Sequence, residues 1–482
     1  MSSAAATSTY KAAAQDAVNY YKHHLPEKVA TDLPVPDATF FDVMSILAPY
    51  RVTSAAQNVV QDFYMYFARG LYKWDLAQYF TPPAVTRFIV DILSPDWHED
   101  VLDPACGSAD FLTAAFRRGA DAGFQGYADK IWGNDLSGEA VQVAILNMVL
   151  NGDGKSNIKQ VNSLEQVSAQ EGKWDILVCN PPFGSRIVEK DQKILKSFDL
   201  GSAGFRRPKS AAKGEALRSQ ETGILFAELC VRLAKPGTGR VALVVPNGYL
   251  GNTSTKYLEL RRWLIRQAHV AGIVGLPRFT FKGSGADVSA SIIFLEKRDT
   301  PLATLPKADK RSVAVQLIDN VGWSTGDKKA APTYVRDDED GTLVLDDMQQ
   351  PILLSDFHTA LRDIADSEAA ADFPWLARVP GSQALPSGNG FAVSMQEILD
   401  DPHLTLDPKF LSQKRRAIVD QIKAVDHFRL GDVVDFLPEL RDSQGRVVEL
   451  DSKKQYHYVE LSNVETGSYR AESLRGWQLP AR

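Results

Sequence analysis

The chain has 482 residues, enough for about three domains of ordinary size, and 44% of them are hydrophobic. With 24% charged residues, the composition is that of a globular protein and argues against a wholly disordered chain. The formal net charge is −6, which excludes a generally basic nucleic-acid coat. If the protein binds DNA or RNA, its positive charge must therefore be concentrated locally.

Cysteine content and hydropathy indicate the compartment. The three cysteines, Cys106, Cys179 and Cys230, cannot form a disulfide framework and point to a reducing environment. No apolar run approaches the roughly 18–20 residues of a membrane span, and residues 1–15 lack the hydrophobic core of a signal peptide. We therefore expect a soluble, cytoplasmic, multidomain protein that makes no membrane contact.

The first part of the chain predicts helices. Apolar and aromatic residues recur at three- and four-residue spacing in Ala12–His24 and Ala55–Leu76. The run Thr81-Pro82-Pro83 predicts the start of another helix, with Thr81 as N-cap and Pro82 at the first helical position.

From Val101 onwards, short apolar runs alternate with helical patterns. This alternation is typical of a mostly parallel sheet with helices on both faces. The last two runs are joined without an obvious helix, so we expect one antiparallel strand near the end of the sheet. The predicted strands are 101–103, 131–133, 176–178, 241–245, 273–275 and 291–295.

The signal weakens between residues 301 and 425. Within this stretch, residues 336–347 are strongly acidic and predict a solvated surface loop. After Phe428 the pattern changes to short β-like runs with polar turns, which suggests a separate β-rich module.

Two predicted strands end in an acid. The first runs through Val101-Leu102 to Asp103 and is followed by a turn of small residues that leads into a helix. Ligands of doubly wound sheets lie beyond the carboxyl ends of strands, where small residues allow close backbone approach. Asp135 ends the next strand, where an acid can accept hydrogen bonds from both ribose hydroxyls of a nucleoside cofactor. Taken by itself, an acid at this position is better explained as a helix N-terminal acid stabilised by the helix dipole.

The decisive pattern is Asn180-Pro181-Pro182-Phe183, which directly follows the buried strand Ile176–Val178. Two consecutive prolines fix the backbone and remove two N–H donors, so that carbonyl groups and the Asn side chain face whatever lies beyond the sheet edge. Two acceptors suit an exocyclic amino group, and an aromatic ring can stack on a planar base.

Asp-Pro-Ala-Cys-Gly-Ser followed by Asn-Pro-Pro-Phe resembles the N6-adenine DNA methyltransferases, in particular the modification (M) subunits of type I restriction systems. Three further runs resemble signatures of that group and keep its order: Gln78–Pro82, Gly239–Gly248 and Gly272–Pro277. The resemblance covers about residues 76–297, nearly half the chain.

The resemblance implies a Rossmann-like α/β fold of the S-adenosylmethionine-dependent methyltransferases, with a mostly parallel seven-stranded sheet and one antiparallel strand. An N-terminal helical domain and a C-terminal β-rich module would flank it. The predicted divisions are a helical domain at 1–75, the catalytic domain at 76–300, a connecting region at 301–425, and the start of an incomplete target-recognition domain at 426–482.

The resemblance also implies S-adenosylmethionine as the cofactor. Asn180, Pro181, Pro182 and Phe183 would then form the catalytic site, and no metal is expected. The residues implied in cofactor binding are Phe80, Thr81, Pro82, Asp103, Pro104, Ala105, Cys106, Gly107, Ser108, Asp135, Asn162 and Asn180.

Two positions depart from the family pattern. Asn162 stands where relatives often carry an acid that contacts the adenine amino group of the cofactor, although an Asn oxygen can still accept that bond. Ala109 stands where the family usually has glycine. If that position requires a positive φ, alanine costs about 1 kcal/mol there.

The implied reaction requires the target adenine to leave the duplex, at a cost of a few kcal/mol, because a paired base cannot reach a pocket at a sheet edge. Positive charge for DNA binding occurs in Arg186–Arg218, which has nine basic residues against four acidic ones, a net +5. A loop that contacts phosphates and a merely solvated loop are both consistent with this run.

The runs Arg429–Val434, Tyr456–Glu460 and Gly476–Pro480 resemble the opening of a target-recognition domain of specificity subunits. A complete module of that kind would extend well past Arg482, which suggests a truncated chain or a partner that completes it. The implied partners are double-stranded DNA, a specificity subunit and a restriction endonuclease subunit.

Two alternative functions stay open. One is a DNA-binding subunit of such a system that keeps the fold without catalysis, because of the departures at Ala109 and Asn162. The other is methylation of RNA adenine or of a protein glutamine, which also uses an Asn-Pro-Pro-aromatic site. The Asp-Pro-Ala-Cys-Gly run, the long helical start and the β-rich end argue against this second alternative.

Overall fold

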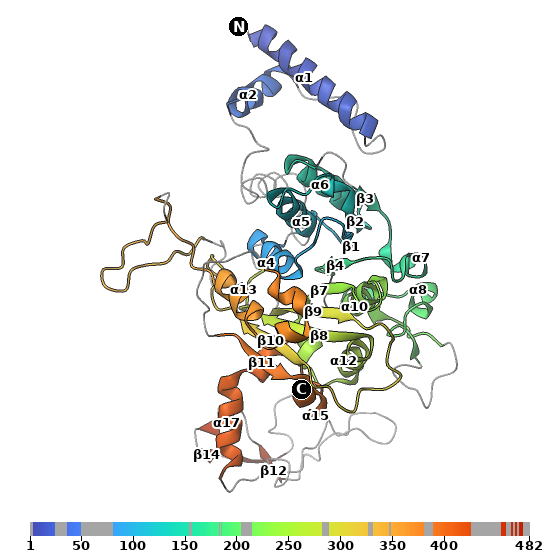
Figure 1. Cartoon of the computed structure of the whole chain (residues 1–482), viewed down its shortest axis with the longest axis vertical. Helices are drawn as coiled ribbons and strands as arrows, with labels where there is room; N and C mark the ends of the chain where they lie inside the picture. The colour runs from blue at the N-terminus through green and yellow to red at the C-terminus, as the bar shows by residue number, and fades with distance from the viewer. Residues whose placement is uncertain are drawn as a thin grey trace. The chain divides into compact units, whose positions relative to one another are not determined.

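In the computed structural model the chain forms two compact units, Met1–Arg416 and Ala417–Arg482. Figure 1 shows the course of the chain. The structure describes residues 3–24, 36–49, 81–153, 157–182, 184, 186–203, 215–281, 289–325, 331–346, 349–379, 389–425, 455–458, 464–465, 468–469 and 472–475. Among these residues, no helix is both long enough and apolar enough to span a bilayer.

The N-terminal helices are α1 (Ser3–His24) and α2 (Asp37–Leu47). Helix α1 contains the predicted helix 12–24, whereas the predicted helix 55–76 lies outside the described residues. Helix α4 (Pro83–Leu93) begins one residue later than predicted. Pro82 is its N-cap and Pro83 occupies the first turn, so the prediction of Thr81 as N-cap was wrong. The Thr81 side chain instead bonds to Asn180.

A nine-stranded sheet forms the centre of the first unit, in the order β11-β10-β8-β9-β7-β4-β1-β2-β3. Strands β9 and β11 run antiparallel to their neighbours and the other pairings are parallel. The strands are β1 (Val101–Asp103), β2 (Ile131–Asp135), β3 (Asn157–Gln160), β4 (Ile176–Cys179), β7 (Arg240–Pro246), β8 (Ala268–Gly275), β9 (Ala290–Lys297), β10 (Ser312–Leu317) and β11 (Phe391–Ser394).

The seven strands from β8 to β3 form the predicted mostly parallel sheet, with β9 as its one antiparallel strand. All six predicted strands are present. Strand β3 was not predicted, and β10 and β11, which come from the weakly patterned stretch 301–425, extend the sheet beyond β8. The α/β fold class is therefore confirmed.

Helices cover both faces of this sheet (Figure 1). Because side chains alternate along a strand, Ile176 and Val178 of β4 enter one hydrophobic core while Leu177 and Cys179 enter the other. The first core is closed by α4, α5 (Asp110–Asp121), α6 (Gly138–Leu150) and α13 (Phe357–Ala365), and the second by α10 (Thr222–Leu233), α12 (Thr255–Gln267) and α15 (Met395–Asp400).

Shorter elements complete the first unit. They are η3 (Tyr127–Lys130), η4 (Ser163–Glu165), α7 (Val167–Gln170), β5 (Val188–Glu189), α8 (Gln192–Lys196), β6 (Gln220–Glu221), α11 (Asn247–Gly251), α14 (Ala369–Asp372), η6 (Pro374–Ala377) and α16 (Pro408–Leu411). Helix α17 (Gln413–Lys423) crosses the boundary between the units. The second unit contains two antiparallel pairs, β12 (Gln455–Tyr458) with β15 (Glu472–Arg475), and β13 (Val464–Glu465) with β14 (Ser468–Tyr469).

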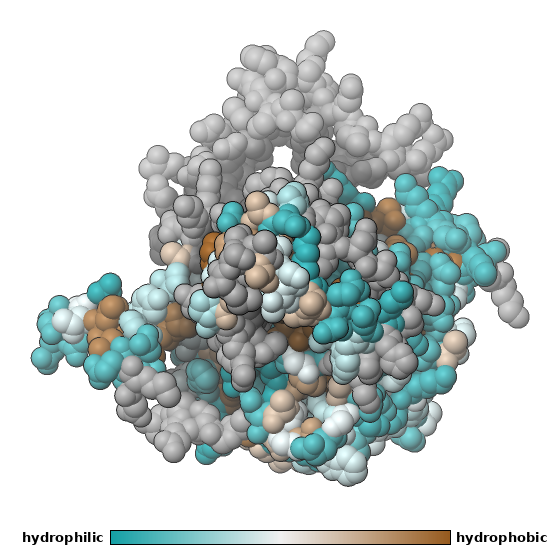
Figure 2. Space-filling model, turned by 90° about the horizontal axis from the view of Figure 1, so that it is seen from above, coloured by the Kyte–Doolittle hydropathy of each residue, from teal (hydrophilic) through white to brown (hydrophobic). Residues whose placement is uncertain are grey.

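Residues 331–346 and 349–354 belong to a projecting arm (Figure 1), whose two sides are joined by isolated bridges such as Tyr334 to Leu353 and Arg336 to Leu343. The described residues of the predicted acidic loop, 336–346, are exposed except for the half-buried Val344. The arm also exposes apolar side chains, and Figure 2 shows hydrophilic and hydrophobic residues side by side on it, at the left of the view.

Candidate active site

Three neighbouring strands bring the predicted site residues to one edge of the sheet. Strand β1 ends at Asp103 and pairs in parallel with both β2, which ends at Asp135, and β4, which is followed by Asn180. The chain order of the strands reverses around β1, since β2 and β3 lie on one side of it and β4 and β7 on the other. Ligands of open α/β sheets bind at such a point, beyond the carboxyl ends of the strands.

The small-residue turn after β1 is held by the two strand-end acids. The carboxylate of Asp103 accepts a hydrogen bond from the backbone N–H of Ala105 (3.0 Å), and that of Asp135 accepts one from Gly107 (3.0 Å). The backbone N–H of Cys106 donates to the carbonyl of Asn134 (2.8 Å), which ties the turn to β2. Gly107 has φ of 51°, a value that glycine adopts without strain.

Both acids have raised pKa values. Complete burial of Asp103 raises the pKa of its carboxyl well above its usual value, against the opposing effect of the Ala105 hydrogen bond. Desolvation also raises the pKa of Asp135, which is half-buried. A second backbone N–H, from Ser137, donates to the other oxygen of Asp135 (2.8 Å). Backbone hydrogen bonds from Ser137, Gly107 and Leu136 oppose this rise in the pKa, and the carboxylate keeps acceptor capacity for a hydroxyl group.

Ala109 adopts the left-handed conformation, with φ 63° and ψ 31°, as the N-cap of α5. This backbone is one that glycine adopts without strain, and it costs alanine about 1 kcal/mol. Two contacts hold Ala109 in this conformation. Its side chain is completely buried, and its carbonyl accepts the first backbone hydrogen bond of the helix, from the N–H of Thr113 (2.8 Å).

Asn180 is half-buried at the end of β4, and its two amide atoms differ in their partners. Nδ2 donates to the hydroxyl oxygen of Thr81 (3.0 Å). Oδ1 is buried and has no partner among the described residues. Pro181 is buried and Pro182 exposed, while Phe183 lies outside the described residues. An unpaired buried acceptor costs about 1–3 kcal/mol, so a donor group of a ligand has a ready place there.

Of the residues predicted ahead of the first strand, Phe80 lies outside the described residues. Thr81 is buried, and its backbone N–H donates to the carboxylate of Asp110 (3.0 Å). Hydrogen bonds through Asp110 thus link Thr81 and the turn 104–108, and Thr81 in turn contacts Asn180.

Asp110 is a residue to which the sequence analysis assigned no role. It is only 4% exposed, and its carboxylate also accepts hydrogen bonds from Ser108 Oγ (2.6 Å) and, at 3.4 Å, from Asn147 Nδ2 of α6. Burial raises the pKa of Asp110 to about 7, opposed by these hydrogen bonds. The sequence signal that could have revealed it is an acid placed among apolar residues, directly after the turn and before Phe111.

Asn162 follows strand β3 and is the N-cap of η4. Its Oδ1 accepts the backbone N–H of Leu164 (3.2 Å), and its Nδ2 donates to Glu165 (2.9 Å). The neighbouring Ser163 donates to the carbonyl of Pro104 (2.7 Å) and so links this loop to the turn after β1. The cofactor contact expected of Asn162 stays a prediction.

A family model described as N-6 DNA Methylase matches residues 56–330, more than half of the chain. The chain belongs to the N-6 DNA methylase family. The type I restriction enzyme EcoEI methylase subunit of Escherichia coli is 28% identical over 254 residues, 51% of this chain and 48% of that relative. The EcoKI methylase subunit of Escherichia coli strain K12 is 25% identical over 320 residues, 59% and 56% of the two chains.

This N-6 DNA methylase therefore spans about half the length of these two relatives. Among solved structures, a chain from a study of the assembly and conformational transition of the type I restriction–modification system is similar in fold. Its TM-score is 0.51 at 19% identity, covering 84% of this chain and 78% of that one.

The basic segment Arg186–Arg218 of this N-6 DNA methylase is partly described. Arg186, Lys190, Lys193, Lys196 and Arg218 are exposed, and the other four basic residues lie outside the described residues. The completely buried carboxylate of Glu228 in α10 anchors the segment by accepting the backbone N–H groups of residues 199 and 200, both at 2.8 Å.

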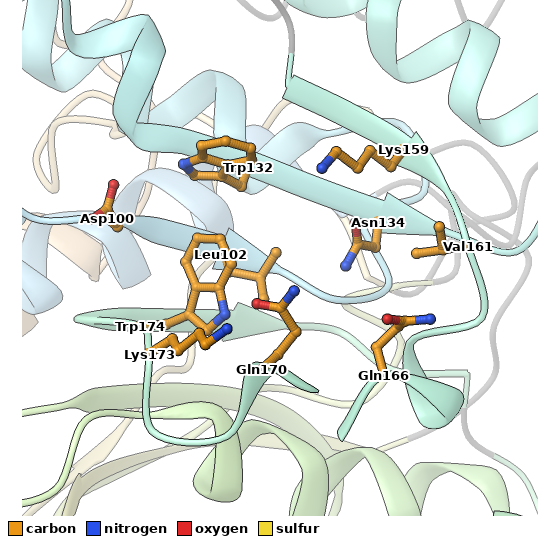
Figure 3. A pocket seen from close by; sticks show the side chains of 10 residues that line it. All are labelled: Asp100, Leu102, Trp132, Asn134, Lys159, Val161, Gln166, Gln170, Lys173 and Trp174. Atoms are coloured by element: carbon orange, nitrogen blue, oxygen red, sulfur yellow. The ribbon is translucent and has the colours of Figure 1, made fainter. Parts of the chain in front are cut away.

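A cavity of about 540 Å³ lies on the face of the sheet over β1, β2 and β3 (Figure 3). It exists because α7 is a single turn, too short to cover three strands. Its lining is mixed, with two tryptophans and two lysines: Asp100, Leu102, Trp132, Asn134, Lys159, Val161, Gln166, Gln170, Lys173 and Trp174. None of the predicted cofactor-binding residues is among them, although Leu102, Asn134 and Val161 directly precede Asp103, Asp135 and Asn162 in the chain. Among the described residues, no cluster of His, Cys, Asp or Glu could hold a metal ion.

Proposed function

We propose that this N-6 DNA methylase transfers a methyl group from S-adenosylmethionine to the N6 amino group of a flipped-out adenine in DNA, as the modification subunit of a restriction–modification system. The observation that carries the proposal is the buried, unpartnered Oδ1 of Asn180 beside the turn after β1. A hydrogen-bond acceptor without a protein partner is what an exocyclic amino group requires.

The residues around the turn fit the cofactor. Asp135 offers the remaining acceptor capacity of its carboxylate to a ribose hydroxyl, while the turn 104–108 brings backbone close to the sheet edge, with glycine at its positive-φ position. Asp103 holds the start of that turn, and Thr81 borders it on the side of Asn180. When bound, S-adenosylmethionine supplies an electrophilic methyl group on a sulfonium.

The catalytic residues act on the target nitrogen. Asn180 Oδ1 and the carbonyl of Pro181 accept hydrogen bonds from the N6 amino group, which favours tetrahedral geometry and a nucleophilic lone pair. Phe183 stacks on the flipped base. In-line attack then depends on positioning more than on a strong base, since the methylated amino group loses its proton easily.

The proposed partners rest on the similarity to the EcoEI and EcoKI methylase subunits. EcoEI and EcoKI methylase subunits are parts of type I restriction enzymes, and for this chain we propose the same assembly with a specificity subunit and a restriction endonuclease subunit on double-stranded DNA in the cytoplasm. The exposed basic residues of Arg186–Arg218 contact DNA phosphates.

Methylation in cells tests the proposal directly. Unmethylated host cells express the full chain, alone and together with a specificity subunit from the same source, and single-molecule sequencing of their DNA reports the modified base and its context. We expect N6-methyladenine at a defined sequence, absent with Asn180→Ala. If calorimetry shows that S-adenosylmethionine binds but no modified adenine appears in either strain, the chain is a non-catalytic DNA-binding subunit instead. The αL alanine at 109 favours that second candidate.

A further inference from the structure

A buried carboxyl group that the proposed mechanism does not use lies between the turn after β1 and Asn180. Asp110 begins α5, and hydrogen-bond donors from three separate parts of the chain converge on it: the backbone of Thr81, the hydroxyl of Ser108 and the amide of Asn147. Burying a carboxyl group is costly unless it is well hydrogen-bonded, so these donors identify a built arrangement and not a chance contact.

One of these donors leads directly to the catalytic residue. Thr81 gives its backbone N–H to Asp110 and, through Oγ1, accepts Nδ2 of Asn180, so that three residues from distant parts of the sequence form one chain of contacts. Thr81 is 3% exposed. Its hydroxyl oxygen is therefore held where it meets the amide.

The orientation of the Asn180 amide decides whether it can serve the target. With Nδ2 bound to Thr81, Oδ1 is the amide atom left without a described partner. If the amide turned over, its NH2 group would face the amino group of the target, and two donors would oppose each other. A hydroxyl group can donate as well as accept, so Thr81 selects the productive orientation through the arrangement seen here, in which its oxygen accepts Nδ2.

We propose that Asp110 is a positioning residue, which holds Thr81 so that the Thr81 hydroxyl fixes Asn180 with Oδ1 directed to the target amino group. The inference rests on the proposed function. The same carboxyl holds Ser108 at the turn after β1, so one residue sets the cofactor turn and the catalytic amide relative to each other.

Threonine variants test the link without removing the buried carboxyl. Thr81→Val keeps the backbone N–H and the shape of the side chain but removes the hydroxyl, whereas Thr81→Ser keeps the hydroxyl. We expect Thr81→Val to lower kcat for methylation, measured at saturating S-adenosylmethionine, about tenfold or more, and Thr81→Ser to lower it by no more than about threefold. Equal activity of the two variants, at either level, would overturn the proposal, because the hydroxyl would then have no role.

A double-mutant cycle tests the role of Asp110. Asp110→Asn keeps the shape and one acceptor oxygen, and we expect it to lower kcat about tenfold. If Asp110 acts through Thr81, the double variant Asp110→Asn/Thr81→Val loses no more than the worse single variant, whereas independent effects would multiply to about a hundredfold. Multiplied losses, or a folded Asp110→Asn with wild-type kcat, contradict the proposal. If Asp110→Asn fails to fold, the comparison of Thr81→Val with Thr81→Ser still decides whether the Thr81 hydroxyl positions Asn180. A wild-type protein that methylates nothing in the same assay contradicts the proposed function instead.

Discussion

The carboxylate of Asp135 accepts the backbone N–H of Gly107 at 3.0 Å, which joins the end of β2 to the turn after β1. Asp135→Asn puts an amide where two backbone donors now converge, so that its NH2 group must oppose one of them. Losing a charged hydrogen-bond acceptor costs about 1.5–3 kcal/mol, and we expect a 10- to 100-fold rise in the Kd of S-adenosylmethionine by calorimetry. Asp121→Asn, at an exposed acid of α5, is the control. An unchanged Kd in Asp135→Asn would remove this residue from the cofactor site.

A substitution of Asn180 distinguishes cofactor binding from catalysis. Asn180→Ala removes both amide atoms but leaves Asp135 and the turn 104–108 intact. We expect methylation below about one hundredth of wild type, because the acceptor for the target amino group is gone, with the Kd of S-adenosylmethionine nearly unchanged. Asn252→Ala, at an exposed residue, serves as control. Retained methylation in Asn180→Ala would invalidate the site assignment.

The backbone at Ala109 can be tested by stability. Ala109→Gly relieves the αL conformation, worth about 1 kcal/mol, but loses a buried methyl group, worth about 0.8 kcal/mol, and adds freedom to the unfolded chain. We therefore expect a change of less than about 1 kcal/mol. Ala115→Gly, equally buried inside the same helix, loses the methyl group and about 1 kcal/mol of helix propensity, so it should cost about 2 kcal/mol. If thermal unfolding showed the same loss of stability for Ala109→Gly and Ala115→Gly, the αL backbone of Ala109 would carry no strain that glycine relieves.

The sequence alone predicted strand β4 and the Asn-Pro-Pro run after it because both are marked by local sequence patterns. Strand β4 is a continuous apolar run that ends in Asn-Pro-Pro, and both signals lie within a few residues. Strand β3 escaped prediction because it lies at the edge of the sheet, where only Ile158 of its four residues is buried, so no apolar run marks it. Asp110 escaped for a different reason. Its donors at Thr81 and Asn147 are 29 and 37 residues away in sequence, and only the folded structure brings them together.

The raised pKa of the buried Glu228 carboxyl leads us to expect that the stability of the protein depends on pH. Burial raises the pKa of this carboxyl from 4.5 to about 7 in the folded protein. Between these two values the folded state holds a proton that the unfolded state has released, so the contribution of Glu228 is complete below about pH 4.5 and is lost as the pH rises through about 7. Glu228→Gln cannot titrate. We expect the stability of wild type relative to this variant to fall from pH 5 to pH 8 in thermal unfolding; a constant difference would show that the pKa is not raised.

Salt dependence tests the basic segment. If Arg206 and Arg207 contact phosphates, each releases a counterion, so the double variant Arg206→Ala/Arg207→Ala should lower the slope of log Kd for DNA against log salt concentration by about 2. Lys307→Ala/Lys310→Ala is the matched control. It removes the same charge from exposed residues before β10, at the edge of the sheet opposite to Asn180, and should leave the slope unchanged. If both variants lower the slope equally, binding follows net charge alone and the segment is not a specific DNA contact. An unchanged slope in both would exclude these arginines from the interface.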